Sequence, residues 1–441
     1  MKEKIRSLFR YNFVKDTAIL QAGTFISTGL SFAASVVFAR VLGPEDYGIY
    51  ALIFAFVGLI EIFMNWGADY ATITLLAEAW ARRDKEEIKN IIVFFVKTSL
   101  IISFTIGLLA ILLAPILAEK IYHQHFQVGL LARWIIAAGL IRFVFFLSTI
   151  ILQVSRKIKY LTTLENINKI IYIIIPVGLV FLGLGIYGIV IGHLISALIF
   201  FIFSFYLYQK LLKRTELLPN LKEIWRELKT VSIKKYFKFG FLIAINKNLA
   251  NLYSILPITF LGMLMTGTQI SYFKIAFSYI GLSLMFLGPI SRLLMVQLPR
   301  SKVQGHQVLK EHFFKTAFYS FLIICVIIIP MVFLSKYLVV FFYGANYLPT
   351  VKLIYLLWPY ALIAAWGIGL GALYRTINKM KAAIIIDTVN LVIGAPIFYW
   401  LIKQYDLIGM AITTIAWLGI TTLVSWIYLN RYFKKISLKN N

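Results

Sequence analysis

Negative charge and cysteine are scarce in this sequence of 441 residues. It holds 18 acidic residues against 44 lysines and arginines, and charged residues make up 14% of the chain, compared with roughly 25% in a soluble domain. The one cysteine, Cys325, excludes a disulfide within the chain and argues against a thiolate metal site. No polar segment is long enough to form a nucleotide-binding domain, so ATP is not expected to act directly.

Apolar residues are correspondingly abundant, at 61% of the chain. A chain this apolar could not cover its surface in water, which indicates an all-α polytopic membrane protein. The net charge of +26 would otherwise suggest nucleic-acid binding. The basic residues lie mostly in short loops between apolar runs, however, so the bilayer is the expected partner and nucleic acid is not.

Twelve apolar segments have about the ~20 residues that cross a bilayer. The predicted spans are 17–40, 48–68, 90–115, 130–154, 160–183, 186–209, 237–262, 270–296, 313–335, 351–374, 381–402 and 407–430.

Loop charges predict the orientation of these spans. Lysine and arginine are concentrated in the amino-terminal arm, in alternate loops and in the tail, which places both termini in the cytoplasm. The longest loop is basic, and 221–228 has the spacing of an amphipathic helix that lies on the inner leaflet or serves as a solvated linker. We predict an N-terminal lobe over 1–210, a linker over 211–236 and a C-terminal lobe over 237–441.

The two halves repeat at an offset of 222 residues. Lys157 and Lys159 align with Lys379 and Lys381, and an acid-x-x-Asn pattern follows in both halves. Because an even number of spans separates the copies, they have the same orientation, and we expect two six-helix lobes related by a parallel pseudo-twofold axis.

A short stretch over 38–50 separates the first two spans. Gly43-Pro44 ends the first helix, because proline lacks an N–H and restricts the residue before it. Glu45 and Asp46 then lie at the positive end of the next helix. The pattern predicts a tight helical hairpin that faces outward.

The chain resembles the polysaccharide-biosynthesis (Wzx-type) oligosaccharide flippases. The resemblance rests on the stretch from Ala39 to Tyr50, the segment from Phe342 to Tyr347, the basic arm and the twelve spans. The resemblance implies a V-shaped cavity between the two lobes, in a bacterial inner membrane protein that is not an enzyme. It also implies that alternating access moves an undecaprenyl-pyrophosphate-linked oligosaccharide, such as an O-antigen unit, to the outer face. Polysaccharide polymerase machinery is then a candidate partner.

A diphosphate cargo requires cations inside the membrane, because an unpaired charge in hydrocarbon is costly. Snorkelling or structural pairing are the alternatives for such cations. The candidate substrate-binding cations are Arg40, Arg142, Lys247 and Lys274.

The first span carries a polar stripe at helical spacing, which either lines a sugar-binding cavity or packs against another helix. The stripe consists of Gln21, Thr24, Thr28, Ser31 and Ser35.

Two acids within spans, Glu61 and Asp387, are candidates for ion coupling. Asp387 could instead pair with Lys381 in its own loop. A proton gradient, a sodium gradient or the membrane potential are the candidate driving forces, and no cofactor or metal is predicted. Two other functions stay open: a multidrug or small-molecule exporter, and a membrane polysaccharide polymerase or ligase.

Overall fold

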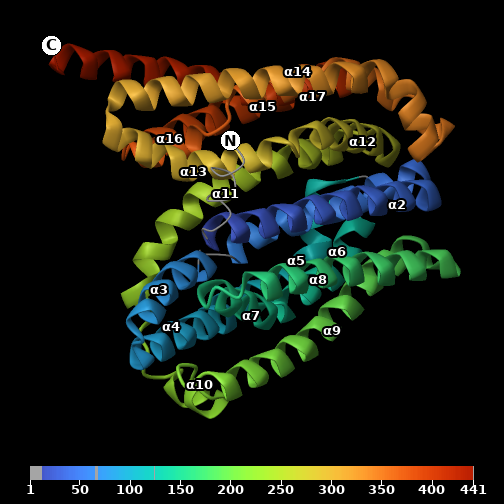
Figure 1. Cartoon of the computed structure of the whole chain (residues 1–441). Coiled ribbons are helices and arrows are strands. Elements are labelled where there is room, and N and C mark those ends of the chain that lie inside the picture. The colour runs from blue at the N-terminus through green and yellow to red at the C-terminus, as the bar shows by residue number, and fades with distance from the viewer. Residues whose placement is uncertain (1–11, 65–67, 124, 441) are drawn as a thin grey trace. The chain divides into compact units, whose positions relative to one another are not determined.

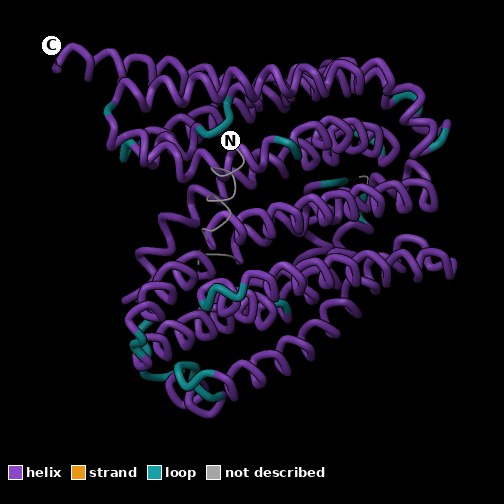
Figure 2. Tube along the Cα trace, viewed as in Figure 1, coloured by secondary structure: helices purple, strands orange, loops and turns teal. Residues whose placement is uncertain are grey.

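The computed structural model describes residues 12–64, 68–123 and 125–440 of the chain. These residues form helices joined by short turns, and the described part contains no β-strand (Figure 2). This agrees with the predicted all-α class, because only a helix satisfies its own backbone polar groups when it is surrounded by lipid.

The helices follow one another along the chain as labelled in Figure 1. The first half contains α2 (Asn12–Met64), α3 (Ala68–Arg82), α4 (Lys85–Thr98), the π-helix η1 (Ser99–Ser103), α5 (Phe104–Ile121), α6 (Gln127–Ile141), α7 (Phe143–Val154), α8 (Ile158–Leu179), the π-helix η2 (Val180–Leu184), α9 (Gly185–Arg214) and α10 (Leu221–Glu227). The second half contains α11 (Ile233–Leu264), α12 (Gly267–Leu284), α13 (Leu287–Gln304), α14 (His306–Tyr343), the 3₁₀-helix η3 (Ala345–Tyr347), α15 (Thr350–Trp366), α16 (Leu370–Thr376) and α17 (Met380–Asn440).

The described helices are consistent with the twelve predicted spans. Six continuous helical segments are long and apolar enough to cross a membrane, and two bent pairs, α6 with α7 and α12 with α13, add one span each. Backbone breaks at Gly43, at Gly183–Gly185 and at Asp406 divide three of the six segments into two helices each. Helix α11 coincides with the remaining predicted span and contains a shorter apolar stretch, Asn251–Leu264.

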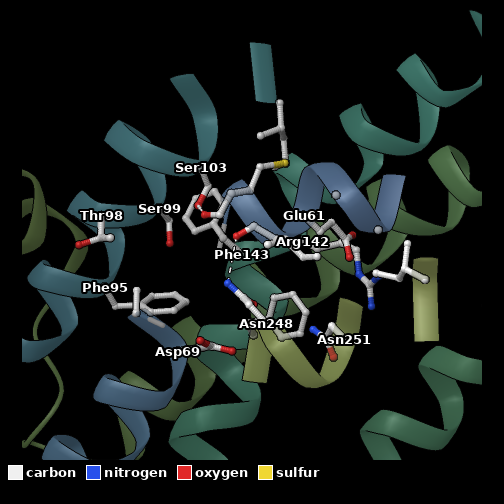
Figure 3. A pocket seen from close by; sticks show the side chains of 18 of the residues that line it. Glu61, Asp69, Phe95, Thr98, Ser99, Ser103, Arg142, Phe143, Asn248 and Asn251 are labelled. Carbon is white, nitrogen blue, oxygen red and sulfur yellow. Dashed lines mark hydrogen bonds between the residues drawn. The ribbon is translucent and has the colours of Figure 1, made fainter. Parts of the chain in front are cut away.

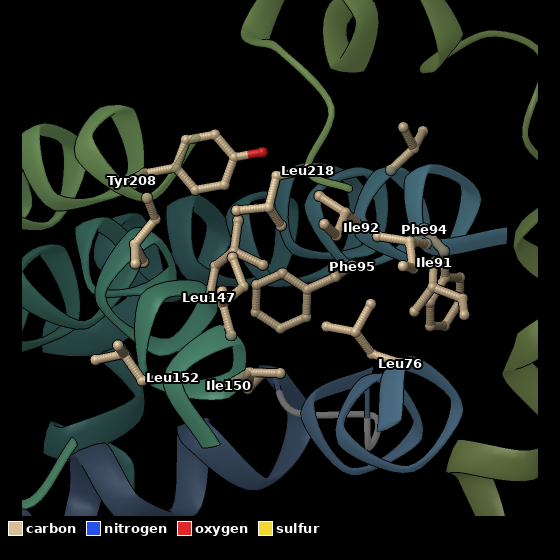
Figure 4. Close-up of a cluster of buried hydrophobic side chains, with 14 of the residues drawn as sticks. Leu76, Ile91, Ile92, Phe94, Phe95, Leu147, Ile150, Leu152, Tyr208 and Leu218 are labelled. Atoms are coloured by element: carbon tan, nitrogen blue, oxygen red, sulfur yellow. The ribbon is translucent and has the colours of Figure 1, made fainter. Parts of the chain in front are cut away.

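The chain divides into two compact units. The first unit comprises Met1–Leu42 and Leu52–Ile255, and the second comprises Gly43–Ala51 and Leu256–Asn441. In the first unit a cluster of buried apolar side chains joins α3, α4, α7 and α9, and Figure 4 shows Phe95, Leu147 and Leu76 within it. The lobe boundaries predicted around 211–236 stay a prediction.

The hairpin stretch belongs to the second unit, where it contacts the start of α12. Gly43 interrupts α2 with φ 74° and ψ 175°, a conformation that glycine adopts without a steric penalty. Glu45 Oε2 accepts hydrogen bonds from the backbone N–H of Thr268 at 2.9 Å and from its hydroxyl at 2.8 Å. Glu45 therefore caps α12 as well as lying near the start of its own helix, a contact that the sequence did not indicate.

The predicted internal repeat is visible in the backbone of each unit. Arg156 and Asn378 end equivalent helices with φ 56° and 57°. The following lysines donate equivalent hydrogen bonds, from Lys157 N to the Leu152 carbonyl at 2.9 Å and from Lys379 N to the Tyr374 carbonyl at 2.8 Å. All of these pairs are separated by 222 residues.

The connections between the last two spans also match in the two units. Gly185 has φ 53° and ψ −135° at the start of α9, and Asp406 has φ 51° and ψ −133° at the break in α17. Three residues later, Gly188 lies against Leu179 and Gly409 lies against Leu401. The last two spans of each unit thus form the same hairpin, with a left-handed residue at each end.

Replacing Gly48 by alanine should destabilise the protein, because a Cβ at this position would overlap the carbonyl group of Gly267. We expect a loss of about 1–3 kcal/mol, measured as a lower midpoint of thermal unfolding in detergent. Gly29→Ala is the matched control, since no atom lies within 4 Å of a Cβ there. Equal unfolding midpoints for the two variants would contradict the close hairpin contact.

Candidate functional site

A polar cavity of about 420 Å³ lies within the first unit (Figure 3). Helices α2, α3, α4, α6, α7 and α11 and the π-helix η1 supply its walls. Its polar lining consists of Glu61, Asp69, Thr98, Ser99, Ser103, Arg142, Asn248, Asn251 and Ser254. Carboxylates, a guanidinium, hydroxyls and amides are thus gathered among helices whose other faces are apolar. This combination is typical of a binding site for a polar ligand.

Glu61 enters the cavity from the second half of α2, where its side chain is exposed to the cavity. Two glycines border this part of the cavity. A Cβ on Gly139 would be 3.9 Å from Glu61 Oε1, whereas Gly58 allows close packing of α2 against α11, because a Cβ there would be 2.9 Å from Ile255 Cδ1. A larger residue in place of Gly139 would reduce the space around the carboxylate.

Arg142 lies where the fourth predicted span bends by 40°, between α6 and α7. Its guanidinium is 5.0 Å from the centre of the Tyr172 ring and 5.4 Å from that of Phe146, two cation–π contacts that orient a cation in a partly dry site. Its charge acts on the Glu61 carboxylate, and both side chains are labelled at the cavity in Figure 3.

The π-helix η1 forms another part of the wall. Ser99 and Ser103, at its two ends, both line the cavity, and Ser103 donates a hydrogen bond to the Met64 carbonyl at 3.0 Å. π-helical turns are rare and are frequently found at functional sites, because they displace side chains from the regular helical register.

Helix α11 contributes a polar face to the cavity. Asn248 donates to the Ile62 carbonyl at 3.1 Å, and Ser254 donates to the Asn251 carbonyl at 2.8 Å. Asn248, Asn251 and Ser254 recur every three residues, so their spacing could have suggested a shared face. Asp69 also lines the cavity. It was missed because it lies just beyond the predicted second span.

Of the predicted substrate-binding residues, Arg142 lines the cavity and the stripe on the first span does not. In the stripe, Thr28 donates to the Thr24 carbonyl at 2.8 Å, and Ser31 donates to the Ser27 carbonyl at 2.8 Å. Gln21 is half-buried on the same helix. Gly23 lies tightly against Thr162 of α8, so this end of α2 also serves helix packing.

The remaining predicted residues lie elsewhere. Arg40 is exposed on α2 shortly before the Gly43 break. Lys274 on α12 and Asp387 on α17 are half-buried in the second unit. Lys247 belongs to α11, but its side chain lies outside the described part of the structure. Their predicted roles stay predictions, and Glu61 and Arg142 are the two that the cavity of the first unit brings together.

A family model described as polysaccharide biosynthesis protein matches residues 37–352. The chain belongs to this family. A segment of 110 residues, a quarter of the chain, is 33% identical to stage V sporulation protein B of Bacillus subtilis strain 168. The match spans 21% of that relative's length.

Solved structures share the fold across nearly the whole chain. An inward-facing multidrug resistance MATE family transporter of the MOP superfamily matches with a TM-score of 0.74 at 14% identity, covering 96% of this chain and 100% of its own. The lipid II flippase MurJ matches with a TM-score of 0.72 at 18% identity, covering 96% and 90%. The chain therefore has the two-lobed fold of these transporters, as predicted.

A cysteine placed in the cavity should react with a small methanethiosulfonate reagent. In a Cys325→Ser background we expect Ser99→Cys to react roughly tenfold faster than Ser148→Cys, because reactivity requires an accessible thiolate. Ser99 lines the cavity, whereas Ser148 is fully buried and bonded to the Ser204 carbonyl. Mass spectrometry would measure both rates, and an unreactive Ser99→Cys would argue against a water-accessible cavity.

Proposed function

We propose that this polysaccharide biosynthesis protein is a flippase for an undecaprenyl-pyrophosphate-linked oligosaccharide, which it moves from the cytoplasmic to the outer face of the membrane. The observation that carries the proposal is the polar cavity within the first unit, where Arg142 lies among hydroxyl and amide side chains. Membership of the family supports the same class of cargo.

The chemistry of the cavity suits both parts of such a headgroup. A diphosphate needs a cation wherever it leaves water, and a guanidinium binds phosphate oxygens through a fork of N–H donors. Sugar hydroxyls need both donors and acceptors, which Ser99, Asn251 and Ser254 provide. The Nε atom of Arg142 is buried and has no hydrogen-bond partner among the described residues, so this guanidinium has donor capacity available for a ligand.

Glu61 is the proposed site of ion coupling. Its carboxylate and a diphosphate would compete for the same guanidinium, since the charge of Arg142 already acts on Glu61. Protonation of Glu61 would remove this competition, and a proton gradient could thereby bias the transport cycle. A sodium gradient or the membrane potential are the other candidate driving forces.

A multidrug exporter is the second candidate function. Glu61 and Asp69 both line the cavity, and two carboxylates with one arginine could accept a cationic compound. The fold shared with the MATE transporter is compatible with this candidate.

The proposed setting is the inner membrane of a bacterium, with both termini in the cytoplasm. Lysines and arginines concentrate at one set of span ends, such as Lys157, Lys210, Lys379 and Lys435, and the positive-inside rule assigns such ends to the cytoplasm. The oligosaccharide would be polymerised on the other face, so a polysaccharide polymerase is a plausible partner.

Reconstitution in vesicles tests the proposal directly. We expect the purified protein to move a fluorescent undecaprenyl-diphosphate oligosaccharide across the bilayer faster than empty vesicles do, as measured by protection from a membrane-impermeant quencher. A proton gradient should change the rate, and Glu61→Gln should remove this dependence. Failure to move the lipid together with uptake of a cationic dye would overturn the proposal in favour of the exporter.

Arg142→Gln should lower the rate of lipid-linked oligosaccharide transport by about tenfold or more, because a charge-assisted hydrogen bond contributes roughly 1.5–3 kcal/mol. Arg82→Gln is the matched control, since Arg82 is exposed at the end of α3 and does not line the cavity. Unfolding midpoints would establish that both variants fold. Equal transport by the two folded variants would remove Arg142 from the proposed site.

A further inference from the structure

In each unit, a hollow separate from the polar cavity lies near the ends of the last two spans. In the first unit a hollow of about 210 Å³ lies among α7, α8 and α9. Lys157 and Lys210 stand at its rim, and its other walls are mainly apolar, including Leu164, Phe203 and Leu207. Among the described residues, none that lines it is acidic.

The second unit has a hollow that includes Lys379, the repeat equivalent of Lys157. This one, of about 480 Å³, is formed by Lys379 before α17 and by Tyr428, Arg431, Tyr432 and Lys435 near the end of α17. Its described lining residues likewise include no acid.

An apolar groove of about 510 Å³ runs along the same helix in the second unit. Its walls include Trp366, Trp426 and Ile427, and it ends at Asn430. The groove and the basic hollow lie on different faces of α17, because Trp426 and Asn430 share one face and Arg431 and Lys435 share another. The apolar walls of the basic hollow are therefore the rings of Tyr428 and Tyr432 and the side chain of Ile436.

The repeat positions one lysine of each hollow in the same way. Lys157 and Lys379 each follow a residue in the left-handed region, Arg156 and Asn378, and each backbone N–H is bonded to the end of the preceding helix. The two lysines are 222 residues apart, at equivalent points of the repeat. The same loop geometry therefore presents a lysine to the last span in both units.

Both hollows open at the ends of membrane spans. The segment Ile158–Leu211 is long and apolar enough to cross the membrane and return, and Lys157 and Lys210 lie at its two ends. Lys379 and Lys435 lie at the two ends of the apolar segment Met380–Ile436. Basic pockets at span ends on the cytoplasmic side are the places where anionic lipid headgroups bind.

The basic side chains of the hollows are available for a ligand. Within the described residues, no ion pair involves Lys157, Lys210, Lys379, Arg431 or Lys435. By contrast, two other lysines on the basic side are bound to the protein, Lys97 to the Val231 carbonyl and Lys302 to the Thr376 carbonyl, both at 2.8 Å. A ligand with a negative headgroup and an apolar tail would match both the charge and the walls.

We propose that each hollow binds one anionic phospholipid, such as phosphatidylglycerol, from the leaflet that faces the basic loops. Lys157 and Lys210 hold the phosphate in the first unit, and Lys379, Arg431 and Lys435 hold it in the second. The acyl chains lie along the adjoining apolar walls. The two lipids are distinct from the transported cargo and stabilise the hairpin of the last two spans in each unit.

Native mass spectrometry of the full chain, titrated with phosphatidylglycerol or phosphatidylcholine, tests the two sites. We expect two phosphatidylglycerol molecules to bind preferentially. Lys157→Gln with Lys210→Gln should remove one of them, and Lys379→Gln with Arg431→Gln should remove the other. Each lost charge should weaken its site about fivefold, the equivalent of ~1 kcal/mol per basic residue near an anionic membrane surface.

Lys159→Gln with Lys381→Gln is the matched control, because these exposed lysines occupy the same two loops but line neither hollow. Equal loss of lipid in this control would overturn the proposal in favour of general surface charge. Lys157→Arg and Lys379→Arg should retain binding, which separates loss of charge from misfolding.

The choice of ligand has its own controls. Soluble glycerol phosphate should not displace the lipid, because it cannot use the apolar walls. Displacement by glycerol phosphate at lipid-like concentrations would overturn the assignment to a phospholipid. Tighter binding of a polyprenyl phosphate at these positions would also overturn it, by assigning the hollows to the cargo.

Discussion

The cost of placing charge among membrane-spanning helices governs the interior of this protein. Every backbone group must bond within its helix, and every charge needs a partner or water. Arg142 illustrates how this is met, with aromatic rings on two sides and the Glu61 carboxylate within electrostatic reach. The helix break that exposes this arginine, the π-helix at Ser99 and the asparagines of α11 together make a polar space within an apolar unit.

The internal repeat connects fold and function. Equivalent loops end in left-handed residues, and equivalent hairpins bring glycines against the preceding helix. The two copies differ in the side chains that line their cavities. The first unit holds the polar cavity with Glu61 and Arg142, whereas the second has an apolar groove lined by Trp366 and Trp426. The two units thus share the backbone of these hairpins, and the side chains that differ between the units form the polar cavity in one and the apolar groove in the other.

Two residues of the candidate site are conspicuous in the sequence alone. Arg142 and Glu61 stood out because a charge inside an apolar run is rare, and both line the cavity. The stripe on the first span was ambiguous, since the same spacing serves packing and solvation. Asp69 and Ser103 could not be recognised, because their importance comes from neighbours on other helices. The capping of α12 by Glu45 likewise joins residues 223 positions apart.

The all-α membrane class, the approximate spans, the repeat and the family resemblance could all be predicted from the amino-acid sequence. These depend on composition and periodicity, which are local properties of a chain in a bilayer. The folded structure was needed to show which polar residues share a cavity, that Arg142 lies at a bend, and that Lys157 and Lys379 each border a hollow. Such assignments depend on helix rotation and on breaks in the backbone, and packing between distant segments determines both.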